Sequence, residues 1–317
     1  MRAERVCIEQ IISSTPSCIV SEGGTSAVIF EKQISHICNL IGESHNYVFV
    51  DGPVACGPAK GLPGLEKGPF YSWYEGLLSA QVKTASDLVW DIINDEGPFD
   101  GVIGFSQGAS LALSILYHHE INRPHQPPPF RFAVFICSVL SISPDPEFNA
   151  DIVAKYSRYY RLPDESGLED KGENSNEEEE EEEEKTSKLK KGPRHRVQLL
   201  LPGQKRALVN DMVGFVRQLS DNVADQATAR KQWTRDEGFP RVYHPLVNKQ
   251  RISIPTVHVI GRSDPLRRQS ELQARLCSKS LSRVVEFSGG HRVPRTSSDL
   301  QSVAFEIERA IRMAQLR

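Results

Sequence analysis

Short runs of apolar, often β-branched residues alternate along this chain with longer stretches in which apolar residues recur every three or four positions. The short runs predict buried strands, and the longer stretches predict amphipathic helices. Because the two kinds alternate, the pattern predicts a mostly parallel sheet with crossover helices on both faces, the α/β class. The predicted strands span residues 18–20, 47–50, 99–105, 132–139, 252–261 and 283–289, and the predicted helices span 27–41, 84–96, 109–119, 207–223, 269–279 and 297–315.

One segment breaks this pattern. Residues 163–196 carry a run of glutamates followed by a cluster of lysines and arginines, with almost nothing to bury. A segment of this composition cannot offset its own ordering entropy, so we expect a disordered insertion. The helix predicted at 207–223 is interpreted as part of a small cap over a site. We interpret the whole chain, 1–317, as one domain with the insertion within or beside this cap.

Composition and charge limit the kinds of partner and cofactor that the protein is expected to bind. The formal charge is −3, and it rises to +5 when the eight glutamates at 177–184 are left aside. Without a basic stripe this balance does not favour nucleic acid, and no apolar run is long enough to cross a bilayer. The six cysteines show no CxxC pair or zinc spacing, and the first residues lack the uninterrupted apolar stretch of a secretory signal. We therefore expect a cytoplasmic protein that uses no metal or other cofactor and binds neither nucleic acid nor a membrane.

The sequence Gly-Phe-Ser-Gln-Gly at 104–108 lies between a predicted strand and a predicted helix. In that context the G-x-S-x-G pattern indicates a sharp turn that pushes the hydroxyl of Ser106 out above the sheet. The backbone N–H of Gln107, at the start of the helix, can then donate to an oxyanion. Taken alone, the pentapeptide also fits a glycine-bounded turn with a bystander serine.

Two further residues complete the chain order of an α/β-hydrolase, which is serine, then acid, then histidine. Asp264 follows the predicted strand at 252–261, and His291 follows the one at 283–289. His291 is predicted to take the proton from Ser106, and Asp264 to orient and stabilise the imidazolium. Each residue alone fits an ordinary loop, but the three in this order, each just past a strand, predict a serine hydrolase.

The chain resembles the fungal family of serine hydrolases (FSH), α/β-hydrolases that include thioesterases releasing polyketides from their synthases. The resemblance implies a triad of Ser106, Asp264 and His291, an oxyanion hole completed by backbone N–H groups near Gly23, and an ester or thioester substrate. It also implies an acyl group carried on the acyl carrier domain of a polyketide synthase as one candidate substrate. The matching stretches are GGTSA, VFVDGP, GPFYSWYE, DEGPFDGVIGFSQGASLA, FAVFICS, YHPL, RISIPTVHVIGRSDP and FSGGHRVPR, which together cover most of the chain.

The sequence departs from that family just before Gly23. The family usually reads close to LHGGGTSA, whereas Ser21 and Glu22 stand here in place of the histidine and the first glycine. A carboxylate beside a developing negative charge opposes catalysis in a dry site. Residues 1–20 also lack the long buried first strand of the family. A second interpretation therefore stays open, a hydrolase-like fold that binds an acyl ligand or a partner protein without turning it over.

Three weaker patterns surround this core. Asp51, at the end of the strand at 47–50, fits a turn or cap residue better than a catalytic one. An aromatic cluster fits either the lining of an acyl pocket or core packing. Three arginines around Asp264 fit either a site for the phosphate of a carrier arm or ordinary exposed loop residues. The cluster consists of Phe70, Tyr71, Trp73 and Tyr74, and the arginines are Arg262, Arg267 and Arg268.

Overall fold

In the part of the chain that the structure describes, six parallel strands form the central sheet in the order β2-β1-β5-β6-β7-β8. The computed structural model describes residues 17–20, 23–42, 45–59, 62, 67–150, 200–220 and 240–317. The expected insertion at 163–196, residues 1–16, Ser21 and Glu22 lie outside these described residues. The sheet consists of β1 Ser17–Val20, β2 Tyr47–Val50, β5 Gly101–Phe105, β6 Phe132–Ile136, β7 Thr256–Gly261 and β8 Ser282–Phe287.

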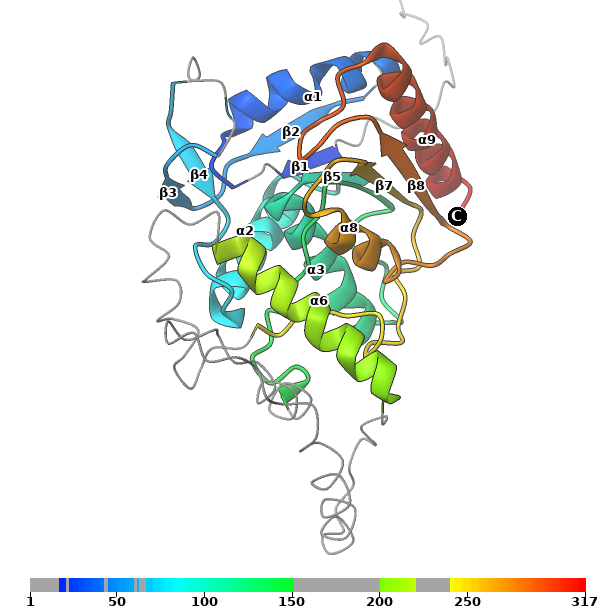
Figure 1. Ribbon diagram of the computed structural model, residues 1–317. Helices are drawn as coiled ribbons and strands as arrows, with labels where there is room; N and C mark the ends of the chain where they lie inside the picture. Colours follow the sequence, from blue (N-terminus) through cyan, green and yellow to red (C-terminus); the bar gives the residue numbers. More distant parts are fainter. Residues whose placement is uncertain are drawn as a thin grey trace, which may run out of the picture.

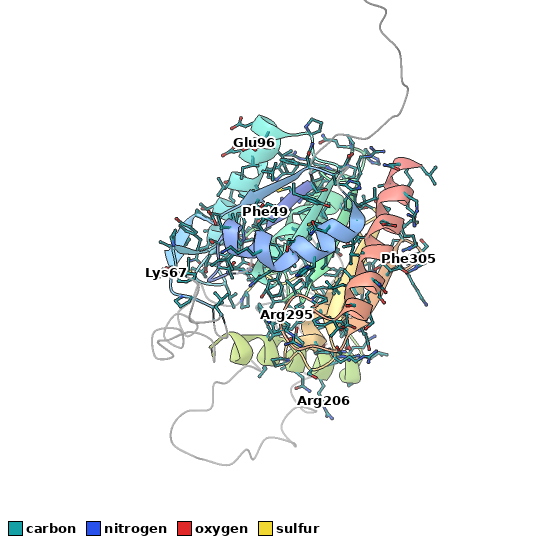
Figure 2. The ribbon with its side chains drawn as sticks, turned by 90° about the horizontal axis from the view of Figure 1, so that it is seen from above. Phe49, Lys67, Glu96, Arg206, Arg295 and Phe305 are labelled. Atoms are coloured by element: carbon teal, nitrogen blue, oxygen red, sulfur yellow. The ribbon has the colours of Figure 1, made fainter. Side chains whose placement is uncertain are left out.

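Helices cover both faces of the sheet, as the alternating pattern predicts (Figure 1). Alternate residues of β5 show why: Val102 packs into the core on one face, and Ile103 and Phe105 pack into the core on the other. Seen from above, α1 and α9 lie together on one side, away from α6 (Figure 2). The helices are α1 Ala27–Ile41, α2 Ser79–Glu96, α3 Gln107–Asn122, α6 Pro202–Ser220, α8 Arg267–Ala274 and α9 Ser297–Gln315.

Helix α1 begins and ends where the sequence predicts. Its buried residues include Phe30, Ile34 and Ile37, which the three- and four-residue spacing places on one face. At its start the side chain of Ser26 accepts a hydrogen bond from the N–H of Ile29 at 3.4 Å. The carboxylate of Asp51 accepts from the N–H of Ala27 at 2.6 Å, so Asp51 caps this helix.

The structure corrects several predicted boundaries. No strand was predicted in the Gly- and Pro-rich stretch after β2, but it contains a two-stranded antiparallel sheet of β3 Val54–Cys56 and β4 Phe70–Ser72. Helix α2 begins at Ser79 rather than at residue 84, and β6 ends at Ile136 rather than at residue 139. Among the described helices, none has the length and apolar content needed to cross a membrane.

Parallel strands place their carboxyl ends at one edge of the sheet, and β5, β7 and β8 all end there. The loops that carry Ser106, Asp264 and His291 therefore converge, although almost two hundred residues separate the first from the last.

Candidate active site

Ser106 occupies the sharp turn between β5 and α3. Its backbone has φ 52° and ψ −113°, a conformation that non-glycine residues rarely adopt. The turn leaves no room for a side chain at position 104, because a Cβ atom at Gly104 would lie 2.6 Å from the backbone N and Cα of Ala109. The N–H of Ser106 donates to the carbonyl of Ile136 at 2.9 Å, which anchors the turn to β6. The sequence therefore forms the strained elbow that the G-x-S-x-G pattern predicts.

The structure brings the three predicted triad residues together. Nε2 of His291 lies 2.8 Å from Oγ of Ser106, and Nδ1 lies 3.0 Å from Oδ2 of Asp264. The Asp264 side chain is fully buried, whereas that of His291 is 21% exposed. Oδ1 of Asp264 accepts from the N–H of Leu266 at 2.7 Å, which holds the carboxylate in this orientation. A hydroxyl, an imidazole and a buried carboxylate thus form one hydrogen-bonded chain.

Cys137 supports this arrangement, a role that its place in the predicted buried strand at 132–139 does not indicate. It follows β6 with φ 45°, and its Sγ lies 3.8 Å from the carbonyl of Gly290 and 3.6 Å from that of Arg292, on either side of His291. Burial, with the nearby carboxylate of Asp264, raises the pKa of the thiol. Cys137 therefore stays protonated and can donate to the loop that carries His291.

The ligand atoms of Cys137, Asp264 and His291 all lie within 4.8 Å of one another, close enough to test as a metal site. A metal needs a thiolate and a free imidazole nitrogen. The pKa of the thiol is raised, and both imidazole nitrogens lie within hydrogen-bond distance of Ser106 or Asp264. The donor set therefore fits a hydrogen-bonded triad better than a metal site.

Of the two residues predicted to supply oxyanion donors, Gln107 directly follows Ser106 and Gly23 lies beside the side chain of Gln107. Gln107 is the first residue of α3, and the N–H of a first helical residue has no carbonyl partner within its helix. A Cβ atom at Gly23 would lie 2.9 Å from Oε1 of Gln107, so the loop before α1 packs directly on this side chain. Ser21 and Glu22, on which the second interpretation depends, precede Gly23 outside the described residues.

Two of the three arginines around Asp264 pair with carboxylates of this chain. Nη2 of Arg267 lies 2.6 Å from Glu286, and its Nε lies 2.8 Å from Glu271. Nε of Arg262 lies 3.6 Å from the other carboxylate oxygen of Glu286. Carboxylates on α8 and β8 therefore balance the charges of these two arginines, which weakens the interpretation of a phosphate site there.

Arg268, the third arginine, binds the helix predicted for the cap. Its guanidinium donates to both carboxylate oxygens of Asp211 on α6, at 2.8 and 2.9 Å, and His244 approaches the same carboxylate at 3.3 Å. Burial raises the pKa of Asp211, but the bonds from His244 and Arg268 outweigh it and lower the pKa to about 2. This cluster connects α6 to α8 at Arg268, which lies four residues after Asp264.

Replacing Asp211 by Asn should lower the free energy of unfolding by about 1–2 kcal/mol, because it removes the charge of a carboxylate that is 9% exposed and accepts two hydrogen bonds from the half-exposed Arg268. Urea unfolding at pH 7 measures the loss. The matched control is Asp87→Asn, which breaks the exposed pair with Lys83 on α2 and should cost less than about 0.5 kcal/mol. Equal losses in the two variants would show that the Asp211 cluster does not hold α6.

The aromatic cluster divides between core and surface. Trp73 and Tyr74 are 1% and 5% exposed and pack into the core beneath α2 and α3. Phe70 and Tyr71 are half-buried in β4. The core interpretation therefore holds for the first two residues.

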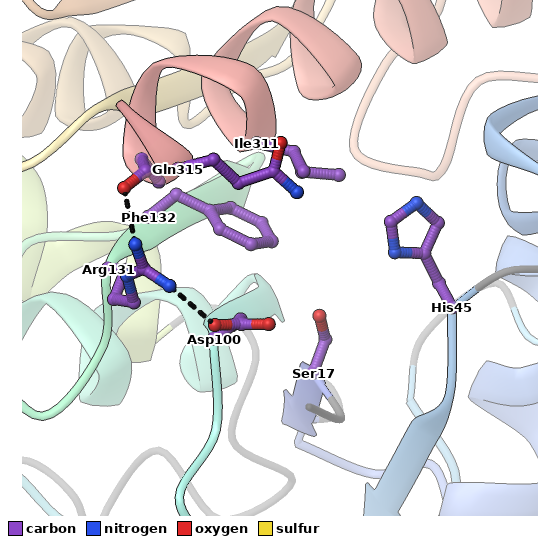
Figure 3. Close-up of a pocket in the computed structure, with 8 residues that line it drawn as sticks. Ser17, His45, Asp100, Arg131, Phe132, Ile311 and Gln315 are labelled. Atoms are coloured by element: carbon purple, nitrogen blue, oxygen red, sulfur yellow. Dashed lines mark hydrogen bonds and ion pairs between the residues drawn. The ribbon is translucent and has the colours of Figure 1, made fainter. Parts of the chain in front are cut away.

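A small pocket lies at the opposite edge of the sheet from Ser106 (Figure 3). It is lined by residues at the amino ends of the strands, among them Ser17 at the start of β1 and Phe132 at the start of β6. An ion pair of 3.3 Å between Arg131 and Asp100 crosses it. The triad residues lie at the carboxyl ends of their strands, so this pocket does not serve them.

Comparison with known proteins agrees with this geometry. Residues 23–303 match the family model described as serine hydrolase (FSH1). The chain is 32% identical over 297 residues to esterase alnB of Emericella nidulans, covering 92% of this chain and 95% of that protein. It is 27% identical over 282 residues to hydrolase FUB4 of Fusarium oxysporum f. sp. lycopersici, covering 87% and 90%.

Among solved structures, a fungal esterase from Rhizomucor miehei aligns over 96% of this chain and 76% of its own, with 13% identity and a TM-score of 0.46. The resemblance to the FSH family expected from the sequence motifs is confirmed by the family match. Because that match spans well over half of the chain, and a relative above 30% identity spans nearly all of it, this protein belongs to the FSH1 family of serine hydrolases.

Proposed function

We propose that this serine hydrolase cleaves an ester or thioester of an acyl substrate through a covalent acyl-enzyme formed on Ser106. The observation that carries the proposal is the unbroken chain from Oγ of Ser106 through His291 to the buried carboxylate of Asp264, at 2.8 and 3.0 Å. This is the geometry in which a base can take a hydroxyl proton while an acid holds the base in the required tautomer.

In the first half-reaction Oγ of Ser106 attacks the acyl carbon, and its proton moves to Nε2 of His291. The carbonyl oxygen becomes an oxyanion, which the backbone N–H groups of Gln107 and Gly23 stabilise. The tetrahedral intermediate then expels the alcohol or thiol, which leaves with the proton from His291. Asp264 stabilises the imidazolium between these two transfers.

In the second half-reaction water attacks the acyl-enzyme. His291 takes one proton from the water and returns it to Oγ of Ser106 as the carboxylic acid leaves. The step needs no redox partner, since the bond to Ser106 breaks as the bond to the water oxygen forms.

For the acyl group we propose a medium or long chain, such as a polyketide held as a thioester on an acyl carrier domain. This choice rests on the family resemblance, because the FSH family includes polyketide-releasing thioesterases. The internal pairing of Arg262 and Arg267 gives no support to a phosphate contact at those two side chains. Recognition of a carrier arm would therefore depend on other residues.

Labelling with a fluorophosphonate probe tests the proposal, since the probe reacts only with an activated serine. We expect the parent protein to be labelled and Ser106→Ala not to be. Rates on acyl thioesters and on oxygen esters of the same chain length then identify the preferred leaving group.

Glu22→Gly separates the two interpretations left open by the sequence. Labelling in this variant alone would place an inhibitory carboxylate beside the oxyanion hole. Absence of labelling in both folded proteins would contradict the proposed function and leave the ligand-binding interpretation.

A further inference from the structure

The side chain of Gln107 makes two hydrogen bonds to one short stretch of backbone. Oε1 accepts from the N–H of Trp73 at 2.9 Å, and Nε2 donates to the carbonyl of Tyr74 at 2.8 Å. Both partners are buried residues just past the end of β4, in a stretch without helix or strand structure. The carboxamide thus links the start of α3 to the segment that follows β4. We call this pair of hydrogen bonds the bracket.

The same β4 segment holds the loop that carries Gly23. The N–H of Gly24 donates to the carbonyl of Tyr71 at 2.7 Å, and the N–H of Tyr71 donates to the carbonyl of Thr25 at 2.7 Å. This exchange is an antiparallel bridge, and it places the β3–β4 hairpin beside the start of α1 (Figure 1). The position of the Gly23 loop therefore depends on the position of β4.

Gly23 also touches the carboxamide itself. A Cβ atom at Gly23 would lie 2.9 Å from Oε1 of Gln107 and 3.1 Å from Oγ of Ser72. The backbone of Gly23 is therefore wedged between the side chain of Gln107 and the end of β4. Any larger residue would have to displace either the Gln107 carboxamide or the loop.

We propose that the Gln107 carboxamide is a positioning residue that sets the distance between the two donors of the oxyanion hole, its own N–H and that of Gly23. This inference rests on the function proposed above. One donor is fixed by its place at the start of α3, and the other is held through the carboxamide and β4. The stabilisation that a donor gives the oxyanion falls steeply when the donor is displaced. Because the bracket sets the distance between the two donors, it affects the energy of the transition state.

Glutamine has the hydrogen-bonding groups that both partners of the bracket require. A carboxamide accepts one hydrogen bond and donates another, as Trp73 and Tyr74 require, and it carries no charge. Glutamate has the same shape but cannot donate to the carbonyl of Tyr74, and it would place a negative charge next to the developing oxyanion. Methionine has a similar length and makes neither bond.

The test compares Gln107→Met and Gln107→Glu with the parent and with Ser114→Ala. Ser114 is a matched control, because its buried hydroxyl donates to the carbonyl of Ile142 at 2.6 Å two turns further along α3. Activity on a p-nitrophenyl ester is measured per active site, with the sites counted by fluorophosphonate. A trifluoromethyl ketone, which forms an oxyanion on the serine, supplies a transition-state analogue.

We expect kcat per active site to fall about 10–100-fold in Gln107→Met, with KM within about threefold of the parent. The inhibition constant of the ketone should rise by the same factor as kcat/KM falls. Gln107→Glu should lose at least as much, and Ser114→Ala should stay within about twofold. The glutamate variant preserves the comparison if the methionine variant does not fold.

Two results would overturn the inference. The first is a kcat per active site in both Gln107 variants within about threefold of the parent. The second is a loss in Ser114→Ala equal to theirs, which would assign the effect to general packing of α3. Absence of labelling in both the parent and Glu22→Gly would instead contradict the proposed function, so the two failures are distinguishable.

Discussion

Asp264→Asn should lower kcat by about 10³–10⁴-fold while leaving the protein folded. Oδ2 of Asp264 lies 3.0 Å from Nδ1 of His291, so the carboxylate keeps the proton on that nitrogen, and Nε2 accepts from the hydroxyl of Ser106 at 2.8 Å. An asparagine amide can donate to Nδ1 instead, which favours the tautomer with its proton on Nε2. That tautomer cannot accept the proton of Ser106, and the imidazolium also loses the charge that stabilises it.

Steady-state rates on a p-nitrophenyl ester, with urea unfolding of the same samples, measure this effect. Asp100→Asn is the matched control, because it makes the same change at the opposite edge of the sheet, where Asp100 pairs with Arg131. Its kcat should stay within about twofold of the parent. A kcat above one tenth of the parent value in Asp264→Asn would mean that Asp264 does not orient His291.

Local pattern predicts the elements whose signals are complete within their own residues. Helices 27–41 and 297–315 have the predicted bounds because each combines an apolar face with a capping hydroxyl, from Ser26 and Thr296. Ser106, Asp264 and His291 could be predicted as a triad for the same reason, since each follows a strand that the sequence pattern indicates. Their roles remain predictions until the variants are measured.

Features that depend on residues far apart in the sequence could not be predicted from local pattern. The strands of the β3–β4 hairpin are three residues long and pair across a Gly- and Pro-rich stretch, so neither shows a strand pattern alone. The N–H of Gln107 was expected from its place in the turn, but its side chain binds backbone more than thirty residues upstream. Likewise Cys137 was expected to be buried, whereas its place beside His291 follows only from the sheet order.

The partner of a charged side chain could not be predicted from the sequence either, as Arg268 shows. The sequence shows an arginine in the loop region near Asp264, which fits recognition of a phosphate. The structure pairs it with Asp211, fifty-seven residues earlier on α6. Charge balance is a property of neighbours in space, and only the fold determines those neighbours.

Acidification below about pH 6.5 should destabilise this protein through His258, by about 1.4 kcal/mol for each pH unit. His258 lies in the middle of β7, is 1% exposed, and packs at a tilt against Phe135, with ring centroids 5.0 Å apart. Within the described residues neither ring nitrogen has a hydrogen-bond partner. Burial therefore lowers its pKa from 6.5 to about 3.

The sign follows from which state binds the proton. Between pH 6.5 and about 3 the unfolded chain protonates this histidine and the folded chain does not, so acid favours unfolding. At pH 5 the loss amounts to about 2 kcal/mol relative to pH 7. His258→Leu removes the titrating group, fills the site with an apolar side chain, and should abolish this part of the acid sensitivity.

Urea unfolding of the parent and of His258→Leu at pH 7 and pH 5 isolates the contribution, because all other titrating groups are common to the two proteins. The parent should lose about 2 kcal/mol more than the variant between these pH values. His125→Leu, at an exposed position in the loop after α3, should follow the parent. Equal losses in the parent and in His258→Leu would mean that the folded protein protonates His258 as readily as the unfolded chain does. The buried ring would then need a partner or a path to water, and the packing of β7 against β6 would have to open to supply it.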